Sequence, residues 1–267
     1  MTAGPLSRLE GLGPIGSVVR FGRDWFARFI HVQGFDRAMA IAAYGYSALI
    51  PLLIVYASIL PSNRSFADAI IERFDLSGSS AETVRQAFAS NDMVNSSVTA
   101  LGIVLLLVSA LSFARGMQRL YELVFGLPTL GLRNTKWALA WLAVICLVVA
   151  LRPAVLSGVG GVLDTIASLA FSGVLWLATP YLLLGRRLRW QQLAPAAVLS
   201  TVGMTGVGIW SVIFMPHILA SSSQEFGVIG IGFALLTWLV AVAIVLVIAA
   251  SGGAVIAERV DAHRARA

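Results

Sequence analysis

Residues 227–250 read GVIGIGFALLTWLVAVAIVLVIAA, a run of 24 residues without a charged side chain. A helix rises about 1.5 Å per residue, so this run is long enough to cross the roughly 30 Å hydrocarbon core of a bilayer. The whole chain shares this character, since 58% of its 267 residues are hydrophobic and only 12% are charged. Soluble domains carry about 25% charged residues. The composition therefore argues against a water-soluble globular enzyme and indicates an integral membrane protein.

Five further apolar runs end at charges, prolines or glycine clusters. Together the runs predict an all-α, polytopic membrane helix bundle with six transmembrane helices, at 38–60, 98–114, 137–163, 166–184, 193–215 and 227–250. Arg152 and Pro153 interrupt the third run, and Asp164 separates it narrowly from the fourth. We therefore expect a tight turn near Asp164.

Basic residues are distributed unevenly over the connections between these runs. Fifteen of the 19 lysines and arginines fall in the N-terminal segment, the second-to-third and fourth-to-fifth connections, and the C-terminal tail. The remaining four, Arg64, Arg73, Arg85 and Arg152, fall on the other side. Because positively charged loops are retained in the cytoplasm, the sequence predicts that both termini are cytoplasmic.

Two segments are predicted to be helical without spanning the membrane. Apolar residues recur at helical spacing between Ile15 and Val32, with arginines opposite, which favours a helix on the inner membrane surface; the alternative is a helix packed under the bundle. Residues 61–97 form an outer hairpin of two short amphipathic helices around a turn at 77–80. The organisation is thus a cytoplasmic segment at 1–37, a transmembrane domain at 38–257 and a tail at 258–267.

Sites for catalysis or metal binding are nearly absent from the sequence. His31 and His263 are predicted inside and His217 outside, so they cannot share an ion, and Cys146 is the single cysteine. Phosphate-binding loops, metalloprotease spacings and nucleophile elbows do not occur. We predict no enzyme activity, no catalytic residue, no metal and no cofactor, and we expect membrane lipids rather than nucleic acid as partners.

Arg152 is the most informative single residue. About 15 residues after Trp137, it lies roughly 22 Å into the core, where a charge costs on the order of 2.5–3.5 kcal/mol. This cost favours a partner, a wet cavity or an anionic amphipathic substrate, while snorkelling to the outer surface is the alternative. Other candidates for a substrate path are the in-membrane polar groups and prolines, namely Tyr44, Tyr46, Pro51 and Pro180.

A second candidate site is the end of the second span. Arg115, Gln118, Arg119 and Glu122 follow one another at three- and four-residue helical spacing. The first interpretation is a solvated face that anchors the span at the headgroups. The alternative is a cytoplasmic gate or a partner site.

Three stretches carry a family resemblance. AAYGYSALIPL at 42–52, SFARGMQRLYELVF at 112–125, and GVIG at 227–230 with Trp238 resemble the YihY/BrkB family of bacterial inner-membrane proteins, particularly its YhjD-like branch. The resemblance covers about residues 20–258. Ala48 stands where the family often has a serine, and the Gly-Ala-acid ending of the family's last span is not clearly present at 251–254, with Glu258 further along the chain.

The resemblance implies a multi-pass protein of the bacterial plasma membrane that contributes to envelope integrity. The first hypothesis is transport of a lipid or another amphipathic molecule through a polar cavity among the helices. The alternative is a membrane scaffold without transport activity. A third is a membrane-embedded enzyme, as in the historical ribonuclease BN label, but the sequence offers no acid/base or metal group for RNA hydrolysis.

Overall fold

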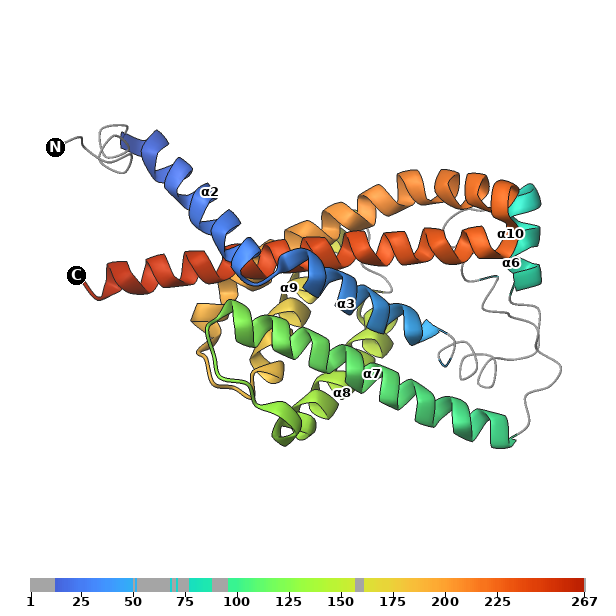
Figure 1. The fold of residues 1–267 in the computed structure, drawn as a ribbon, viewed down its shortest axis with the longest axis horizontal. Helices are drawn as coiled ribbons and strands as arrows, with labels where there is room; N and C mark the ends of the chain where they lie inside the picture. Colours follow the sequence, from blue (N-terminus) through green and yellow to red (C-terminus); the bar gives the residue numbers. More distant parts are fainter. Residues whose placement is uncertain are drawn as a thin grey trace.

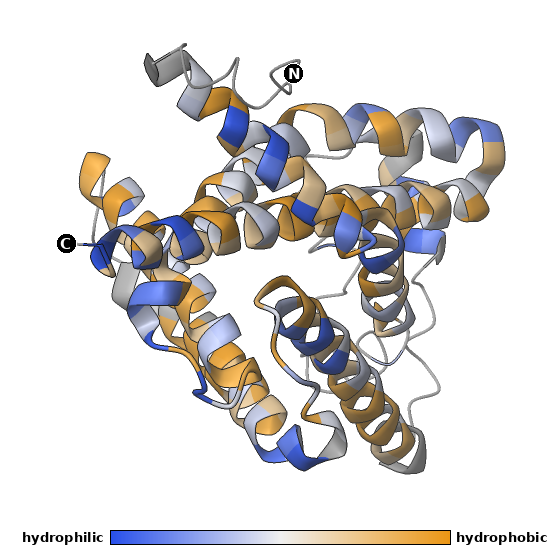
Figure 2. Cartoon of the chain, turned by 60° about the vertical axis from the view of Figure 1, so that its left-hand side comes forward, coloured by the Kyte–Doolittle hydropathy of each residue, from blue (hydrophilic) through white to orange (hydrophobic). Residues whose placement is uncertain are grey.

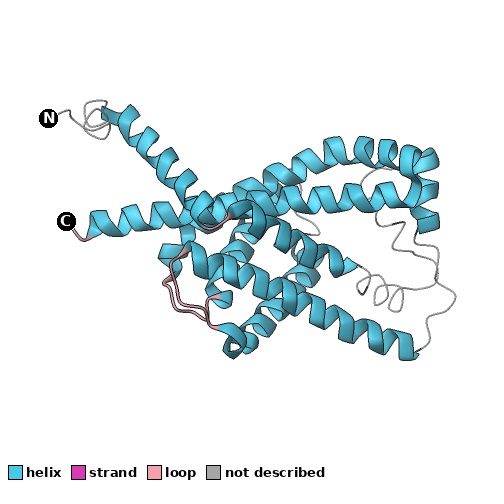
Figure 3. Ribbon diagram, viewed as in Figure 1, coloured by secondary structure: helices cyan, strands magenta, loops and turns pink. Residues whose placement is uncertain are grey.

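The computed structural model describes residues 13–49, 51, 68, 71, 77–87, 96–156 and 161–266. These residues form helices joined by short loops, and no strand occurs among them (Figure 3). The elements are α2 (Gly13–His31), α3 (Gly34–Ser47), α6 (Gly78–Ala87), α7 (Ser96–Val124), η1 (Gly131–Asn134), α8 (Thr135–Leu156), α9 (Val162–Leu183) and α10 (Trp190–Arg264). The predicted all-α fold is confirmed.

α10 consists of two helices that reverse direction at Gly227. This residue has φ 58° and ψ −137°, a conformation that residues with a side chain rarely adopt. The first arm, Trp190–Gly227, and the second arm, Ile229–Arg264, run back along one another (Figure 1). A Cβ atom at Gly203 would lie 2.7 Å from Cγ1 of Val245, and Gly253 packs directly on Ala196. The two arms therefore approach each other closely at these glycines, because glycine has no side chain to separate the helices.

The arms are longer than the spans that the sequence predicts. They hold 38 and 36 residues, which at about 1.5 Å per residue exceeds a hydrocarbon core of roughly 30 Å. The connection at 216–226 is itself helical, because the first arm continues through Pro216 to the reversal at Gly227. The tip is supported by α6, whose Ala81 and Val84 share a small apolar core with Met215 and its neighbours on α10. Packing against α6 thus supports the helix over the more polar stretch at 216–226.

Among the described residues, four helices are long and apolar enough to span a membrane: Ala100–Val124, Val162–Leu183, Trp190–Gly227 and Ile229–Arg264. Within α8, the apolar stretch Thr135–Val148 is shorter than these four helices. The first predicted span begins in α3, but most of its second half lies outside the described residues. Six spans therefore remain a prediction.

α7 continues past the second predicted span, as the helical spacing of residues 115–122 predicts, and ends at Val124, where Gly126 (φ 63°) and a hydrogen bond from Leu127 N–H to the Glu122 carbonyl close it. The predicted boundary between the third and fourth spans is wrong. α9 begins at Val162, so Asp164 lies in its first turn and not between two spans. A carboxylate is favourable there because the N-terminus of a helix carries partial positive charge.

α2 is attached to the second arm of α10 by a face that carries both aromatic and charged side chains. The indole Nε1 of Trp25 donates to the Ile248 carbonyl at 2.8 Å, and Asp24 pairs with Arg259 at 2.6 Å. Arg28 binds both carboxylate oxygens of Glu258 at 2.6 and 2.7 Å. This packing agrees with the alternative of a helix under the bundle. Contact of α2 with the membrane surface stays a prediction, to which its exposed residues Phe26 and Ile30 are suited.

The outer hairpin is described only in part. α6 occupies the place of its second predicted helix, whereas most of the first lies outside the described residues. Hydrophobic residues cover the middle stretches of the long helices and hydrophilic residues gather near their ends (Figure 2). Large apolar side chains point outward there, including Val104 and Val108 on α7 and Val202 and Ile213 on α10. An outward apolar surface of this kind is typical of contact with lipid.

Both described ends of the chain lie at one end of the bundle, together with the loop after α7 and the turn between α9 and α10 (Figure 1). The hairpin tip and α6 lie at the opposite end. We call the first the charged end, because it carries Arg133, Arg186 and the arginines of the tail. The largest apolar core lies near it, around Tyr121 and Leu183.

Candidate functional site

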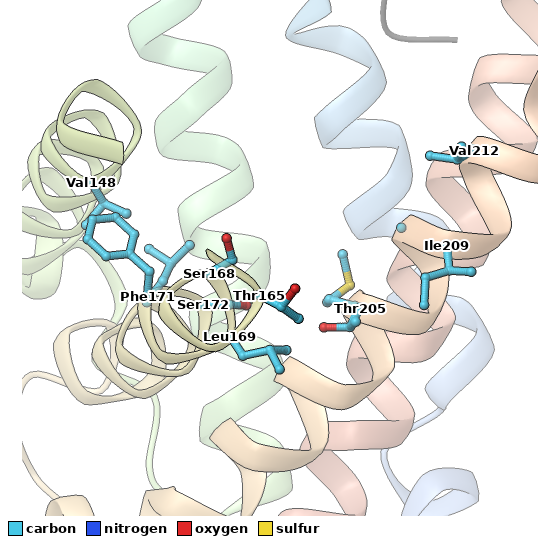
Figure 4. A pocket seen from close by; sticks show the side chains of 12 residues that line it. Val148, Thr165, Ser168, Leu169, Phe171, Ser172, Thr205, Ile209 and Val212 are labelled. Atoms are coloured by element: carbon cyan, nitrogen blue, oxygen red, sulfur yellow. The ribbon is translucent and has the colours of Figure 1, made fainter. Parts of the chain in front are cut away.

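A groove opens between α8, α9 and the first arm of α10. It encloses about 490 Å³, within the size range of ligand pockets. Its walls combine aliphatic and aromatic side chains with hydroxyl groups, and are formed by Val148, Thr165, Ser168, Leu169, Phe171, Ser172, Leu175, Met204, Thr205, Gly208, Ile209 and Val212 (Figure 4). The groove is therefore apolar with a minority of polar groups.

Part of the groove stays open because Gly208, which lines it, has no side chain. A Cβ atom at Gly208 would meet no atom within 4 Å, and the same holds at Gly206. Gly203 thus lies where the two arms of α10 approach closely, whereas Gly206 and Gly208 face open space. Thr205 donates to the Thr201 carbonyl at 2.8 Å, so its hydroxyl is already satisfied within its own helix, as is common in membranes.

A second cluster lies buried at the charged end. Glu122, with 1% of its surface exposed, accepts hydrogen bonds through Oε1 from Gln118 Nε2 at 2.8 Å and Leu130 N–H at 3.0 Å. Arg187 Nη2 approaches the same oxygen at 3.2 Å. Asn134 donates to Gln118 Oε1 at 3.1 Å and to the Leu183 carbonyl at 2.6 Å. We call these four side chains, Gln118, Glu122, Asn134 and Arg187, the buried polar cluster.

The cluster connects the end of α7 and the loop that follows it to the α9–α10 turn, and Arg187 of that turn lies 65 residues after Glu122. Arg187 also donates to the carbonyls of Pro128 and Leu184, at 2.7 and 3.0 Å. It thereby joins the end of α7, the following loop and the α9–α10 turn. The other carboxylate oxygen of Glu122, Oε2, is buried and has no hydrogen-bond partner among the described residues. Such a cluster makes the loops of the charged end one rigid unit, because breaking it would strand a buried charge.

The predicted exit residues divide into two groups. Gln118 and Glu122 are 3% and 1% exposed, so the solvated-face interpretation is wrong for them. Arg119 is exposed and Arg115 is half-buried, in agreement with a face toward the headgroups. Gln118 and Glu122 are buried because one side of α7 still faces α9 and η1 beyond the predicted span, which ends at residue 114.

The structure describes the side chains of four of the five predicted substrate-path residues. Tyr44 packs on Gly116 of α7, while the Tyr46 hydroxyl is directed at Gly232 on α10. Two residues apart, they thus face different neighbours, as the helical period predicts. Pro51 and Pro180 are buried. Arg152 lies within α8, but its side chain is outside the described part of the structure.

Sequence reasoning missed two members of the buried polar cluster. The sequence pattern gives no signal for Asn134, and Arg187 stands out only as one of the basic residues of the fourth-to-fifth connection. A signal for Arg187 did exist, since Glu122 is an acid amid apolar residues and needs a cationic or donor partner if buried. Glu258 was also left without a role, and its partner is Arg28. Within the described ranges, no group of three or more His, Cys, Asp or Glu side chains could hold a metal ion.

The chain was compared with known families, proteins and structures. The sequence profile of a family described as virulence factor BrkB matches residues 25–267. No curated protein and no solved structure matches the chain. The match covers every element described above except the first part of α2.

Proposed function

The chain belongs to the BrkB family, and from this premise we propose that it is a bacterial plasma-membrane protein that carries a lipid or another amphipathic molecule along the groove between α8, α9 and α10. Its family and its apolar helices indicate an integral membrane protein. The groove is the observation that carries the proposal. A role in envelope integrity follows if its cargo is an envelope lipid.

The chemistry of the groove suits a molecule with both apolar and polar parts. Leu169, Phe171 and Ile209 offer apolar contact to acyl chains, while the hydroxyls of Ser168 and Ser172 can bond ester or hydroxyl oxygens. On the first arm the groove spans residues 204–212, about 21–33 Å from the start of α10 by helical rise. The groove thus lies along a part of the first arm that is remote from the charged end.

The position of Arg152 along α8 supports the same proposal. It follows Val148, a groove residue, by four positions, which is one helical turn of α8. An arginine at this depth is costly without a partner. We propose that it attracts the anionic headgroup of a molecule whose chains occupy the groove.

The proposal is tested by filling the groove. The purified protein is reconstituted into vesicles, and exchange of a fluorescent phosphatidylglycerol between leaflets is followed by quenching from outside. Gly208→Leu places a side chain into the groove, whereas Gly206→Leu adds the same atoms at a site outside its lining. We expect the first variant to lose most of the exchange rate and the second to retain it.

Two results would contradict the proposal. If folded Gly208→Leu exchanges lipid as fast as the unmodified protein, the groove is not the path. If the unmodified protein exchanges lipid no faster than empty vesicles, the scaffold alternative without transport is favoured. A recovery of correctly sized, helical protein for both variants is the control for folding.

A further inference from the structure

A basic pocket of about 410 Å³ lies at the charged end, at the turn between α9 and α10. It is separate from the groove, which begins about two turns earlier on α9. Three arginines and two aromatic residues dominate its lining, and no acidic residue contributes to it; the lining residues are Tyr181, Arg186, Arg187, Leu188, Arg189, Trp190 and Gln191. A cavity of this composition attracts an anion.

The three arginines are not equivalent. Arg187 is neutralised by Glu122 and bound to two backbone carbonyls, so it holds the turn in place. Arg186 and Arg189 form no ion pair with any described acidic residue. Two uncompensated positive charges therefore border one cavity.

Arg186 is held in position by aromatic residues. Its Nε donates to the Tyr181 hydroxyl at 2.9 Å, and its guanidinium carbon lies 5.4 Å from the Tyr181 ring centre and 5.8 Å from that of Trp137. Neither of its terminal nitrogens donates to a described residue. With φ 62° it also adopts a left-handed backbone conformation that is uncommon for residues other than glycine. The turn thus presents fixed, unused donors.

The surroundings of the pocket are those of a membrane–water boundary. Trp190 is 58% exposed, and together with Tyr181 and Trp137 it places indole and phenol rings at the end of the apolar helices. Basic pockets between helices at this level suit the headgroups of anionic lipids, whose phosphate binds arginine through paired hydrogen bonds. The N-terminus of α10 at Trp190 adds partial positive charge.

We infer that this pocket binds the phosphate of an anionic phospholipid from the leaflet at the charged end, with Arg186 and Arg189 as its ligands. The lipid is a bound structural or regulatory partner of the turn. The site does not depend on the groove, so a resident lipid binds here whether or not the groove carries cargo.

The test compares binding of three probes to the detergent-solubilised full chain: short-chain phosphatidylglycerol, phosphatidylcholine with the same chains, and inorganic phosphate. Native mass spectrometry counts bound lipid, and thermal unfolding follows stabilisation. The double variant Arg186→Gln/Arg189→Gln removes the proposed ligands. Arg133→Gln/Lys136→Gln removes two exposed charges at the same end and outside the lining, and is the matched control.

We expect phosphatidylglycerol to bind more tightly than phosphatidylcholine. The Arg186/Arg189 double variant should lose about fivefold in affinity per arginine, roughly 25-fold in all, while the control retains binding. Equal loss in both double variants would overturn the site, because general surface charge would then explain the preference. Equal binding of both lipids, or displacement of phosphatidylglycerol by an equal concentration of inorganic phosphate, would overturn a lipid ligand. Lipid exchange through the groove is a separate measurement and can fail or succeed independently.

Discussion

Arg187 and Glu122 form an ion pair whose two ends differ in solvent access, and this difference predicts unequal effects of removing them. Only 2% of the Glu122 side chain is exposed, against 24% for Arg187. Arg187→Gln leaves a buried carboxylate without its cation, which we expect to destabilise the fold by about 3 kcal/mol, the lower end for a broken buried pair. The lower end applies because Gln118 and Leu130 N–H still donate to Glu122.

Glu122→Gln should cost less, about 1 kcal/mol. Its amide oxygen still accepts hydrogen bonds, Arg187 keeps two carbonyl partners, and a negative charge near the C-terminus of α7 is removed. With a coupling energy of roughly 2 kcal/mol, the double variant should cost about 2 kcal/mol instead of the sum of about 4 kcal/mol, and should therefore be about 1 kcal/mol more stable than Arg187→Gln alone.

The measurement is the free energy of unfolding in mild detergent, from reversible denaturant titration of the four proteins of the cycle. Arg119→Gln on the same helix is the control, since Arg119 is exposed, and it should change stability by no more than about 0.5 kcal/mol. If Glu122→Gln proves more damaging than Arg187→Gln, or if the double variant is the sum of the singles, the argument from burial is refuted.

Three further predictions concern topology, packing and the deep arginine. In a chain with Cys146 replaced, a cysteine at Ser79 in α6 should react with impermeant reagents from outside and one at exposed Arg133 only from inside; the reverse would overturn the orientation. Gly253→Leu should abolish assembly of the hairpin, with a loss of several kcal/mol from overpacking against backbone, seen as absence of membrane-inserted protein, whereas normal levels would contradict the close approach. In a deletion strain, Arg152→Lys should restore detergent resistance and Arg152→Leu should not, at equal protein levels; full complementation by leucine would assign Arg152 to snorkelling.

Local properties of the sequence determine the class of the fold and much of its outline. The uncharged run at 227–250 requires an apolar solvent and a helix to satisfy its backbone, because no water is available inside a bilayer. The placement of arginines at alternate connections predicts that both ends of the chain lie on one side, and the described ends, in α2 and at the end of α10, lie at the same end of the bundle. The opposite directions of Tyr44 and Tyr46 also follow from helical period alone.

Contacts between distant residues were decided only by the tertiary structure. The continuation of α10 past Met215 depends on α6 packing on the hairpin tip, and the burial of Glu122 depends on Arg187, 65 residues away, reaching it from another turn. The groove combines side chains of three helices. Gly203 meets a neighbour and Gly208 does not, because the second arm covers only one face of the first arm. Hydropathy and helical period specify that a helix forms and how it is oriented to the membrane. They do not specify which of its faces meets which partner, because that choice depends on the complementarity of surfaces brought together only when the bundle has assembled.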